Sequence, residues 1–256
     1  MKTFNSVWVA TVPRTGSMWT TNVIKEIFKC KNFLVFPDKQ LVSDLDWLNF
    51  YKTDVLFSQN NLNRFVLKIH EKLTKIPPRS KLVTNLRNPY DVCASYYEFM
   101  KCSLNESIKL AQSLRIFVNH YKSLSDNVFT IKYEEIETQP KELIKKLAIF
   151  CEVLLSEVEI NQICKKYEKK EIKKLIDKND SLIASNQTLN NDSFKVLKLK
   201  DGNLRSFDLK TGFQTGHISS RNTGEWKKIF SNQEIDEIIE KLDPITIELG
   251  YSSEKN

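Results

Sequence analysis

The stretch that decides the fold is "VPRTGSMWTTNVIKEIF", residues 12–28. It follows the apolar, β-branched run "SVWVATV", residues 6–12, which has the composition of a buried strand. Gly16 permits a tight turn, and the apolar residues after it recur at helical spacing over 17–29. Backbone amides at a helix N-terminus attract negative charge, so this strand, turn and helix are predicted to hold an anion.

Further along the chain, segments with the composition of strands alternate with helical segments. This alternation predicts an α/β fold of three layers, α/β/α, with a central parallel sheet, in a single domain over 1–256. Ligands of such sheets bind beyond the carboxyl ends of the strands, so the residues directly after each strand are the first site candidates. The predicted strands are 6–12, 64–70, 81–87 and 127–133; the predicted helices are 17–29, 89–100, 105–124, one that opens at Pro140, 156–176 and 231–242; the polar segment 178–224 has no clear assignment.

The bulk composition limits the function classes. Hydrophobic residues make up 41% and charged residues 28%, as in soluble globular proteins, and no stretch approaches the roughly 18 apolar residues that a membrane helix requires. Five scattered cysteines and a start without a signal-peptide pattern indicate reduced thiols in the cytoplasm. The net charge of +7 is compatible with a nucleic acid, an anionic surface or an anionic small molecule. The sequence contains no clustered set of Cys and His residues, so it predicts no metal site.

Two strand ends carry groups that can bind anions. The first loop adds the cation of Arg14 to its amides, although the triphosphate-binding pattern G-x-x-x-x-G-K-[ST] is absent. An ordinary turn with a surface arginine is the alternative for this loop alone. After a later strand, Arg87 stands at the strand tip and Ser95 two helical turns on, where both can face a second anion. Arg–Asp pairing at a helix start is the alternative there.

Taken together, these motifs resemble those of the sulfotransferases that use 3′-phosphoadenosine-5′-phosphosulfate (PAPS). "PRTGSMW", 13–19, is similar to their 5′-phosphosulfate loop, and "RNPYDVCASYY", 87–97, to their 3′-phosphate motif. "VLKIH", 66–70, resembles the segment that carries their catalytic histidine. "IKYEEIETQPKELIKKLAIF", 131–150, and "GEWKKIF", 224–230, resemble two later regions. The motifs follow the family order through nearly the whole chain, so the resemblance implies a P-loop NTPase-like sulfotransferase fold.

The resemblance implies catalytic roles for three residues. His70 matches the general base, and an imidazole titrates near the working pH. Arg14 stands where the family has a lysine that stabilises the leaving oxygen; because its pKa exceeds about 12, it can act only electrostatically. Lys68 matches a lysine near the transferring sulfonate and would project to the same side of its strand as His70.

The resemblance also implies a nucleotide site. Gly16 and Ser17 match the phosphate cradle, and Met18 replaces a threonine, so only its amide can help. Trp19 matches the residue that stacks on adenine. The other matched positions are Thr15 in the first loop, Arg87 and Ser95 for the 3′-phosphate, and Tyr133 as a nucleotide contact. Arg221, Asn222 and Gly224 match positions near the C-terminus, where the family's R-K-G grips the 3′-phosphate and the resemblance implies the same work for the displaced arginine, Arg221.

The implied reaction is direct, in-line transfer of a sulfonate from PAPS to a hydroxyl or amine acceptor, with 3′-phosphoadenosine-5′-phosphate (PAP) as product and no metal. The expected partner is a small-molecule or carbohydrate hydroxyl, not a nucleic acid or a membrane. A nucleotide-dependent phosphotransferase on a related P-loop fold, a nucleic-acid binder and an inactive PAP/PAPS-binding protein are the alternatives. The sequence leaves the acceptor and the oligomeric state open, and the segments 31–62 and 178–220 are expected to shape the acceptor pocket.

Overall fold

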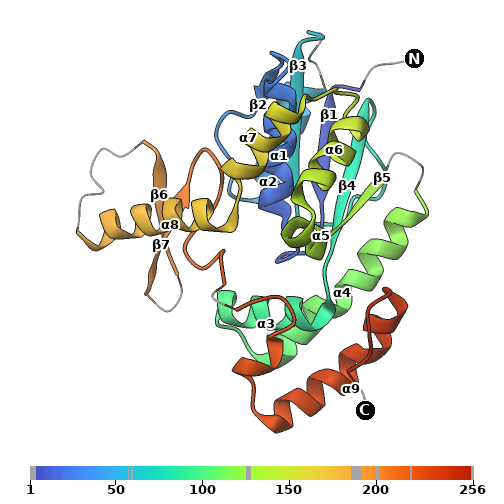
Figure 1. Ribbon diagram of the computed structural model, residues 1–256, viewed down its shortest axis with the longest axis vertical. Helices are drawn as coiled ribbons and strands as arrows, with labels where there is room; N and C mark the ends of the chain where they lie inside the picture. Colours follow the sequence, from blue (N-terminus) through green and yellow to red (C-terminus); the bar gives the residue numbers. More distant parts are fainter. Residues whose placement is uncertain are drawn as a thin grey trace. The chain divides into compact units, whose positions relative to one another are not determined.

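The chain folds around a five-stranded sheet with the strand order β2-β3-β1-β4-β5 (Figure 1). The pairs β2–β3 and β4–β5 are parallel. The predicted α/β class is therefore confirmed: a central, mostly parallel sheet is flanked by helices. The computed structural model describes residues 4–56, 58, 60–124, 128–185, 192–199, 202–219 and 221–254. The strands are β1 (Ser6–Ala10), β2 (Leu34–Phe36), β3 (Asn63–Ile69), β4 (Ser80–Leu86) and β5 (Val128–Lys132).

The chain forms two compact units, and each combines three separate stretches of sequence. The first unit contains Met1–Val7, Met18–Lys68 and Gln139–Ile218. The second contains Trp8–Ser17, Ile69–Thr138 and Ser219–Asn256. The single domain expected over 1–256 stays a prediction.

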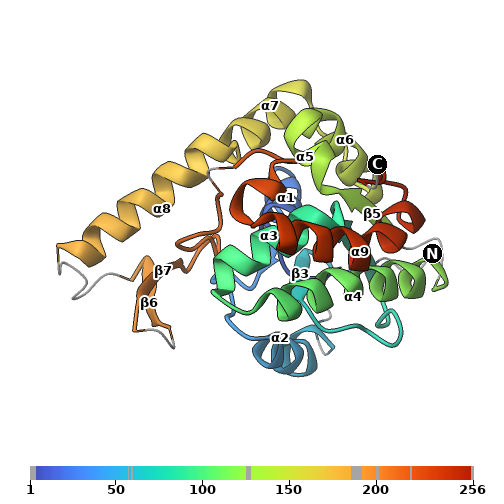
Figure 2. The same cartoon turned by 90° about the horizontal axis from the view of Figure 1, so that it is seen from below.

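The first unit is built on α1, whose apolar stripe is fully buried, as its helical spacing predicts. The prediction of one long helix over 156–176 is wrong. The helix is interrupted at Tyr167, whose side chain is buried, and at Glu168, whose backbone is extended. The charge pattern continues on both sides of the break and so does not reveal it. Figure 2 shows that α8 follows directly after α7. The elements are α1 (Ser17–Lys29), α2 (Asp44–Phe50), the π-helical turn η1 (Tyr51–Val55), α6 (Pro140–Phe150), α7 (Glu157–Lys166), α8 (Lys169–Ala184) and the antiparallel hairpin β6 (Phe194–Lys198) and β7 (Leu204–Asp208).

The second unit packs three helices, α3, α4 and α9, around an apolar core (Figure 2). Tyr90 and Trp226 stack there with ring centroids 4.8 Å apart. The last helix runs past its predicted end at 242 and contains Pro244, because Ile245 and Leu249 pack into the same core. The predicted strand 127–133 is β5, and residue 127 lies outside the described residues. The elements are α3 (Pro89–Met100), α4 (Leu104–Lys122), α5 (Tyr133–Thr138), the 3₁₀ turn η2 (Trp226–Ile229) and α9 (Asn232–Glu248).

Local signals explain where the helices begin. Asn88 accepts the N–H of Tyr90, and Pro89 opens α3, as predicted. Reciprocal serine–carboxylate capping boxes start four other helices, α2, α4, α7 and α9. Within the part of the chain that the structure describes, the helices are all too short or too polar to cross a membrane.

Candidate functional site

The loop after β1 has a backbone conformation that residues with a side chain rarely adopt. Arg14 has φ of 71° and Gly16 has φ of 93°. A Cβ at Gly16 would lie 2.8 Å from Ile136 Cδ1 and 3.1 Å from Tyr133 Cδ2. The positive φ therefore favours glycine at position 16, and the crowding adds to this preference.

Two residues predicted to bind the nucleotide, Thr15 and Asn222, form hydrogen bonds with other groups of the protein. The Thr15 hydroxyl donates to the Val12 carbonyl at 2.8 Å and pairs with the Thr11 hydroxyl at 2.8 Å. The N–H of Asn222 donates to the Glu225 carboxylate at 3.0 Å. The Thr15 side chain therefore holds the loop in shape, and Asn222 shapes the C-terminal segment.

Arg87, directly after β4, lies against the first loop. Its Nη1 donates to the Arg14 carbonyl at 3.0 Å, and its guanidinium carbon lies 4.0 Å from the centroid of the Tyr133 ring. Its Nε is buried, and no described residue accepts a hydrogen bond from it. Buried donors normally have an acceptor, so this orphaned N–H indicates a site for a ligand oxygen.

The side chain of Arg14 turns toward α3. Its Nε donates to the Ser95 hydroxyl at 3.0 Å, and its guanidinium carbon lies 4.1 Å from the centroid of the Phe99 ring. Within the second unit, the structure thus brings together Arg14, Ser95 and Arg87, which the sequence assigned to two neighbouring anion sites. Two arginines beside a hydroxyl form a cationic patch suited to a phosphate.

His70 follows β3 and is half-buried. Its Nδ1 lies 2.8 Å from the Thr11 carbonyl oxygen. A carbonyl can only accept, so Nδ1 carries the hydrogen, and the neutral ring has its lone pair on Nε2. The tautomer fixed by this contact is the one that can take up a proton at Nε2.

The C-terminal segment contacts α3 through two charged groups. Arg221 donates to the Glu98 carboxylate from Nε at 3.2 Å and also from Nη2. The Gly224 N–H donates to both Asp91 oxygens, the nearer at 3.0 Å. Burial raises the pKa of Asp91, and the positive charges of Arg87 and Arg221 partly oppose that rise.

Sequence reasoning missed three residues on α3 that touch this patch. Asp91, Glu98 and Phe99 contact Gly224, Arg221 and Arg14 respectively. Their helical spacing from Ser95 was a usable signal, because residues three or four apart lie on one face. Their partners, however, are distant in sequence and could not be read from it.

Three predicted residues belong to the first unit. Met18 and Trp19, in the first turn of α1, are buried. Burial lowers the pKa of Lys68 to about 8, against the opposing effect of Asp44. A lysine in this range retains most of its positive charge at neutral pH, which the proposed role at a sulfonate requires.

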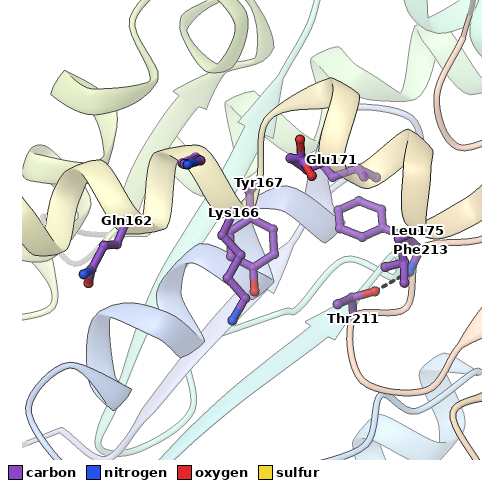
Figure 3. Close-up of a pocket in the computed structure, with 9 residues that line it drawn as sticks. Gln162, Lys166, Tyr167, Glu171, Leu175, Thr211 and Phe213 are labelled. Carbon is purple, nitrogen blue, oxygen red and sulfur yellow. Dashed lines mark hydrogen bonds between the residues drawn. The ribbon is translucent and has the colours of Figure 1, made fainter.

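The first unit also contains a cavity of about 500 Å³ that the sequence did not predict. Figure 3 shows the rings of Tyr167 and Phe213 on one side of the α7–α8 junction (Figure 3). Ile172 and Leu175 add apolar walls. The charged helix predicted over 156–176 thus includes residues that line a cavity, and the charge pattern did not indicate this.

The cavity is tied to α1, the helix that carries Trp19. The Asn22 side chain donates to the carbonyl of Thr211, a cavity residue, at 2.7 Å. Asn22 is three residues after Trp19 and shares its helix face. Burial raises the pKa of Tyr167, and the Glu26 carboxylate raises it further. Among the described residues, no group of three His, Cys, Asp or Glu side chains could hold a metal ion.

Comparison with known proteins identifies one family. The family model described as "Sulfotransferase domain" matches residues 4–243. A retinol dehydratase solved with androsterone and the inactive cofactor PAP is 15% identical, with a TM-score of 0.61 over 98% of this chain and 82% of that one. A mouse sulfotransferase, SULT7A1, solved with PAP is 16% identical, with a TM-score of 0.62 over 96% of this chain and 87% of that one. A retinol dehydratase complex with retinol and PAP has a TM-score of 0.60 at 16% identity, over 100% of this chain and 84% of that one.

Proposed function

Because this chain belongs to the sulfotransferase domain family, we propose that it transfers a sulfonate from PAPS to a hydroxyl or amine acceptor, directly and in line. PAP is present in the similar solved structures, two of which also hold androsterone or retinol. These relatives support a PAPS/PAP site and a small-molecule acceptor; a carbohydrate hydroxyl is the other acceptor that we propose.

The observation that carries the proposal is the orphaned Nε of Arg87. An unmet buried donor costs roughly 1–3 kcal/mol, which an anionic ligand would recover. Arginine binds phosphate through two parallel N–H donors. Ser95 lies beside Arg14, whose carbonyl Arg87 contacts, so a phosphate at Arg87 has the Ser95 hydroxyl in the same patch. We assign the 3′-phosphate to Arg87 and Ser95.

The loop after β1 is assigned to the 5′ end of the nucleotide. Gly16 and Ser17 offer backbone amides where α1 begins, and the helix dipole adds to their attraction for an anion. Arg14 lies in the same loop and supplies a fixed positive charge. The remaining assignments to the nucleotide are Thr15, Met18, Tyr133, Arg221, Asn222 and Gly224.

In this mechanism, the donor supplies an activated sulfonate on a phosphate leaving group. Nε2 of His70 takes the proton of the acceptor hydroxyl as that oxygen attacks sulfur. Arg14 stabilises the negative charge that grows on the leaving phosphate oxygen, and Lys68 stabilises the sulfonate oxygens. Neither cation has to move a proton.

We assign the adenine base to the first unit. Trp19 offers an indole face, and the cavity near the next turn of α1 is lined by Tyr167 and Phe213. A cavity of about 500 Å³ lies within the usual range of small-molecule sites, roughly 300–1,000 Å³. Aromatic walls suit a flat base.

The test is a calorimetric comparison of three ligands: PAP, adenosine 5′-monophosphate (AMP) and ATP with magnesium. We expect PAP to bind at least tenfold more tightly than either of the others, and Arg87→Ala to remove most of this preference. Arg115→Ala, at an exposed arginine of α4, is the control. Tighter binding of magnesium ATP would instead support a phosphotransferase. A screen of acceptors with labelled PAPS then tests the transfer itself. If no acceptor receives the label, the protein is an inactive PAP-binding protein.

The cellular location is part of the same proposal. All five cysteines are free thiols in the structure. Free thiols persist in reducing compartments, so we propose a cytoplasmic protein.

A further inference from the structure

Arg221 has a carboxylate partner of the protein's own. Glu98 accepts hydrogen bonds from its Nε and Nη2. The Arg221 side chain is 9% exposed and that of Glu98 is 39% exposed. The two partners therefore differ: the arginine is confined within the second unit, whereas the carboxylate borders solvent.

This pair belongs to a row of contacts along one face of α3. Asp91, Ser95 and Glu98 stand at intervals of four and three residues, so they share that face. Ser95 receives Arg14, and Glu98 receives Arg221. The guanidinium that Glu98 holds is thus one helical turn from the contact made by an arginine of the phosphate loop.

Resting on the proposed function, we propose that Glu98 is an affinity-determining residue, an internal counter-anion that competes with the 3′-phosphate for Arg221. Carboxylate and phosphate oxygens use the same N–H fork of an arginine. A confined guanidinium is costly without a counter-charge, and Glu98 supplies one.

The charge of Glu98 opposes the phosphate whether or not the ion pair opens. If the carboxylate moves out to solvent, the ligand must first break the pair. If it stays, two anions share one guanidinium and repel each other at short range. In both cases Glu98 weakens binding of the 3′-phosphate and speeds release of the bisphosphate product.

The experiment compares Glu98→Gln with the unaltered protein. Glutamine keeps the shape and one acceptor oxygen but removes the charge. Calorimetry measures the affinities for PAP and for AMP, which lacks the 3′-phosphate. We expect Glu98→Gln to bind PAP about tenfold more tightly and AMP within twofold of the original affinity. Arg221→Ala should weaken PAP binding and make Glu98→Gln silent when the two are combined.

The matched control is Glu248→Gln, which neutralises a carboxylate of the same unit paired with Arg115 at 3.6 Å. It should leave both affinities within twofold. A merely structural Glu98 would move both ligands together or shift only the melting temperature. Unchanged or weaker PAP binding by Glu98→Gln overturns the inference, as does a neutral Arg221→Ala. If PAP shows no advantage over AMP in the unaltered protein and Arg87→Ala changes nothing, the proposed function fails as well.

Discussion

The ring of His70 owes its chemistry to one backbone contact. The Thr11 carbonyl, at the end of β1, holds Nδ1–H at 2.8 Å and leaves the lone pair on Nε2. The sequence could predict that a histidine follows a strand here, because K-x-H ends an apolar run. It could not predict the tautomer, which depends on a carbonyl 59 positions away.

His70→Ala should lower kcat about 10²- to 10⁴-fold, the usual contribution of a general base. The affinity for PAP should stay within twofold, because no phosphate is assigned to this side chain. Steady-state turnover with labelled PAPS and calorimetry with PAP separate the two quantities. His120→Ala, on a histidine that contacts the Leu73 carbonyl, is the control. Equal turnover in His70→Ala and the unaltered protein would remove His70 from catalysis.

Phe213 tests the place of the base. Phe213→Ala should weaken PAP about tenfold, because stacking on an aromatic ring contributes about 1–3 kcal/mol per base. Binding of ribose 3,5-bisphosphate, which has no base, should change less than twofold. If both ligands weaken equally, the adenine does not lie in this cavity.

Among the elements, the loop after β1 and helix α3 follow closely from sequence. A strand, a glycine and an amphipathic stripe predict the first, and Asn88 with Pro89 predicts the start of the second. The break between α7 and α8 and the hairpin β6–β7 could not be predicted. The charge pattern continues through the break, which the buried side chain of Tyr167 marks only in the folded chain. The polar residues around the hairpin have no clear period.

Gly16→Ala should destabilise the protein more than Gly250→Ala. Both glycines have positive φ, 93° and 81°, which costs an alanine about 1–2 kcal/mol. Only Gly16 is also crowded, by Ile136 Cδ1 and the Tyr133 ring, whereas nothing lies within 4 Å of the Cβ position at Gly250. Urea unfolding measures the difference, and PAP binding should fall only for Gly16→Ala. Equal losses in the two variants would show that the crowding has no cost.

For the molecule as a whole, buried positive charge makes stability depend on pH. Lys25, on α1, is 4% exposed, and its Nζ donates to the Pro37 carbonyl at 2.8 Å. Burial, together with the nearby charge of Lys29, lowers its pKa to about 7, and Asp38 opposes the fall. The folded protein therefore binds fewer protons than the unfolded chain between pH 7 and the ordinary lysine range, so stability rises with pH there.

Lys25→Met should remove this dependence. The unfolding free energy of the unaltered protein, relative to the variant, should increase by up to about 1.4 kcal/mol per pH unit above pH 7, and level off near pH 10.5. Urea titrations at pH 6, 7, 8, 9 and 10 measure it, with Lys174→Met, at an exposed lysine of α8, as the reference. A constant difference across this range would show that Lys25 keeps its ordinary pKa.

The fold class was predictable, and so was the place of Arg14 and Arg87 after two strands of the sheet, because the motif order gives both. The contact of Arg14 with Ser95 was not predictable. The counter-charge at Glu98 was not, since its contact spans 123 positions. The division into two units was not either, because it depends on which distant stretches pack together.

That each unit draws on three distant stretches has a consequence for synthesis on the ribosome. The first unit is complete only after Ile218 has emerged from the ribosome, and the second only after Ser219–Asn256 has followed. In the nascent chain, apolar surfaces of each unit therefore stay exposed until the stretch that covers them has been synthesised. A stop codon between Ile218 and Asn256 would yield a product with an incomplete second unit. We expect chaperones or proteases to bind its exposed apolar surface.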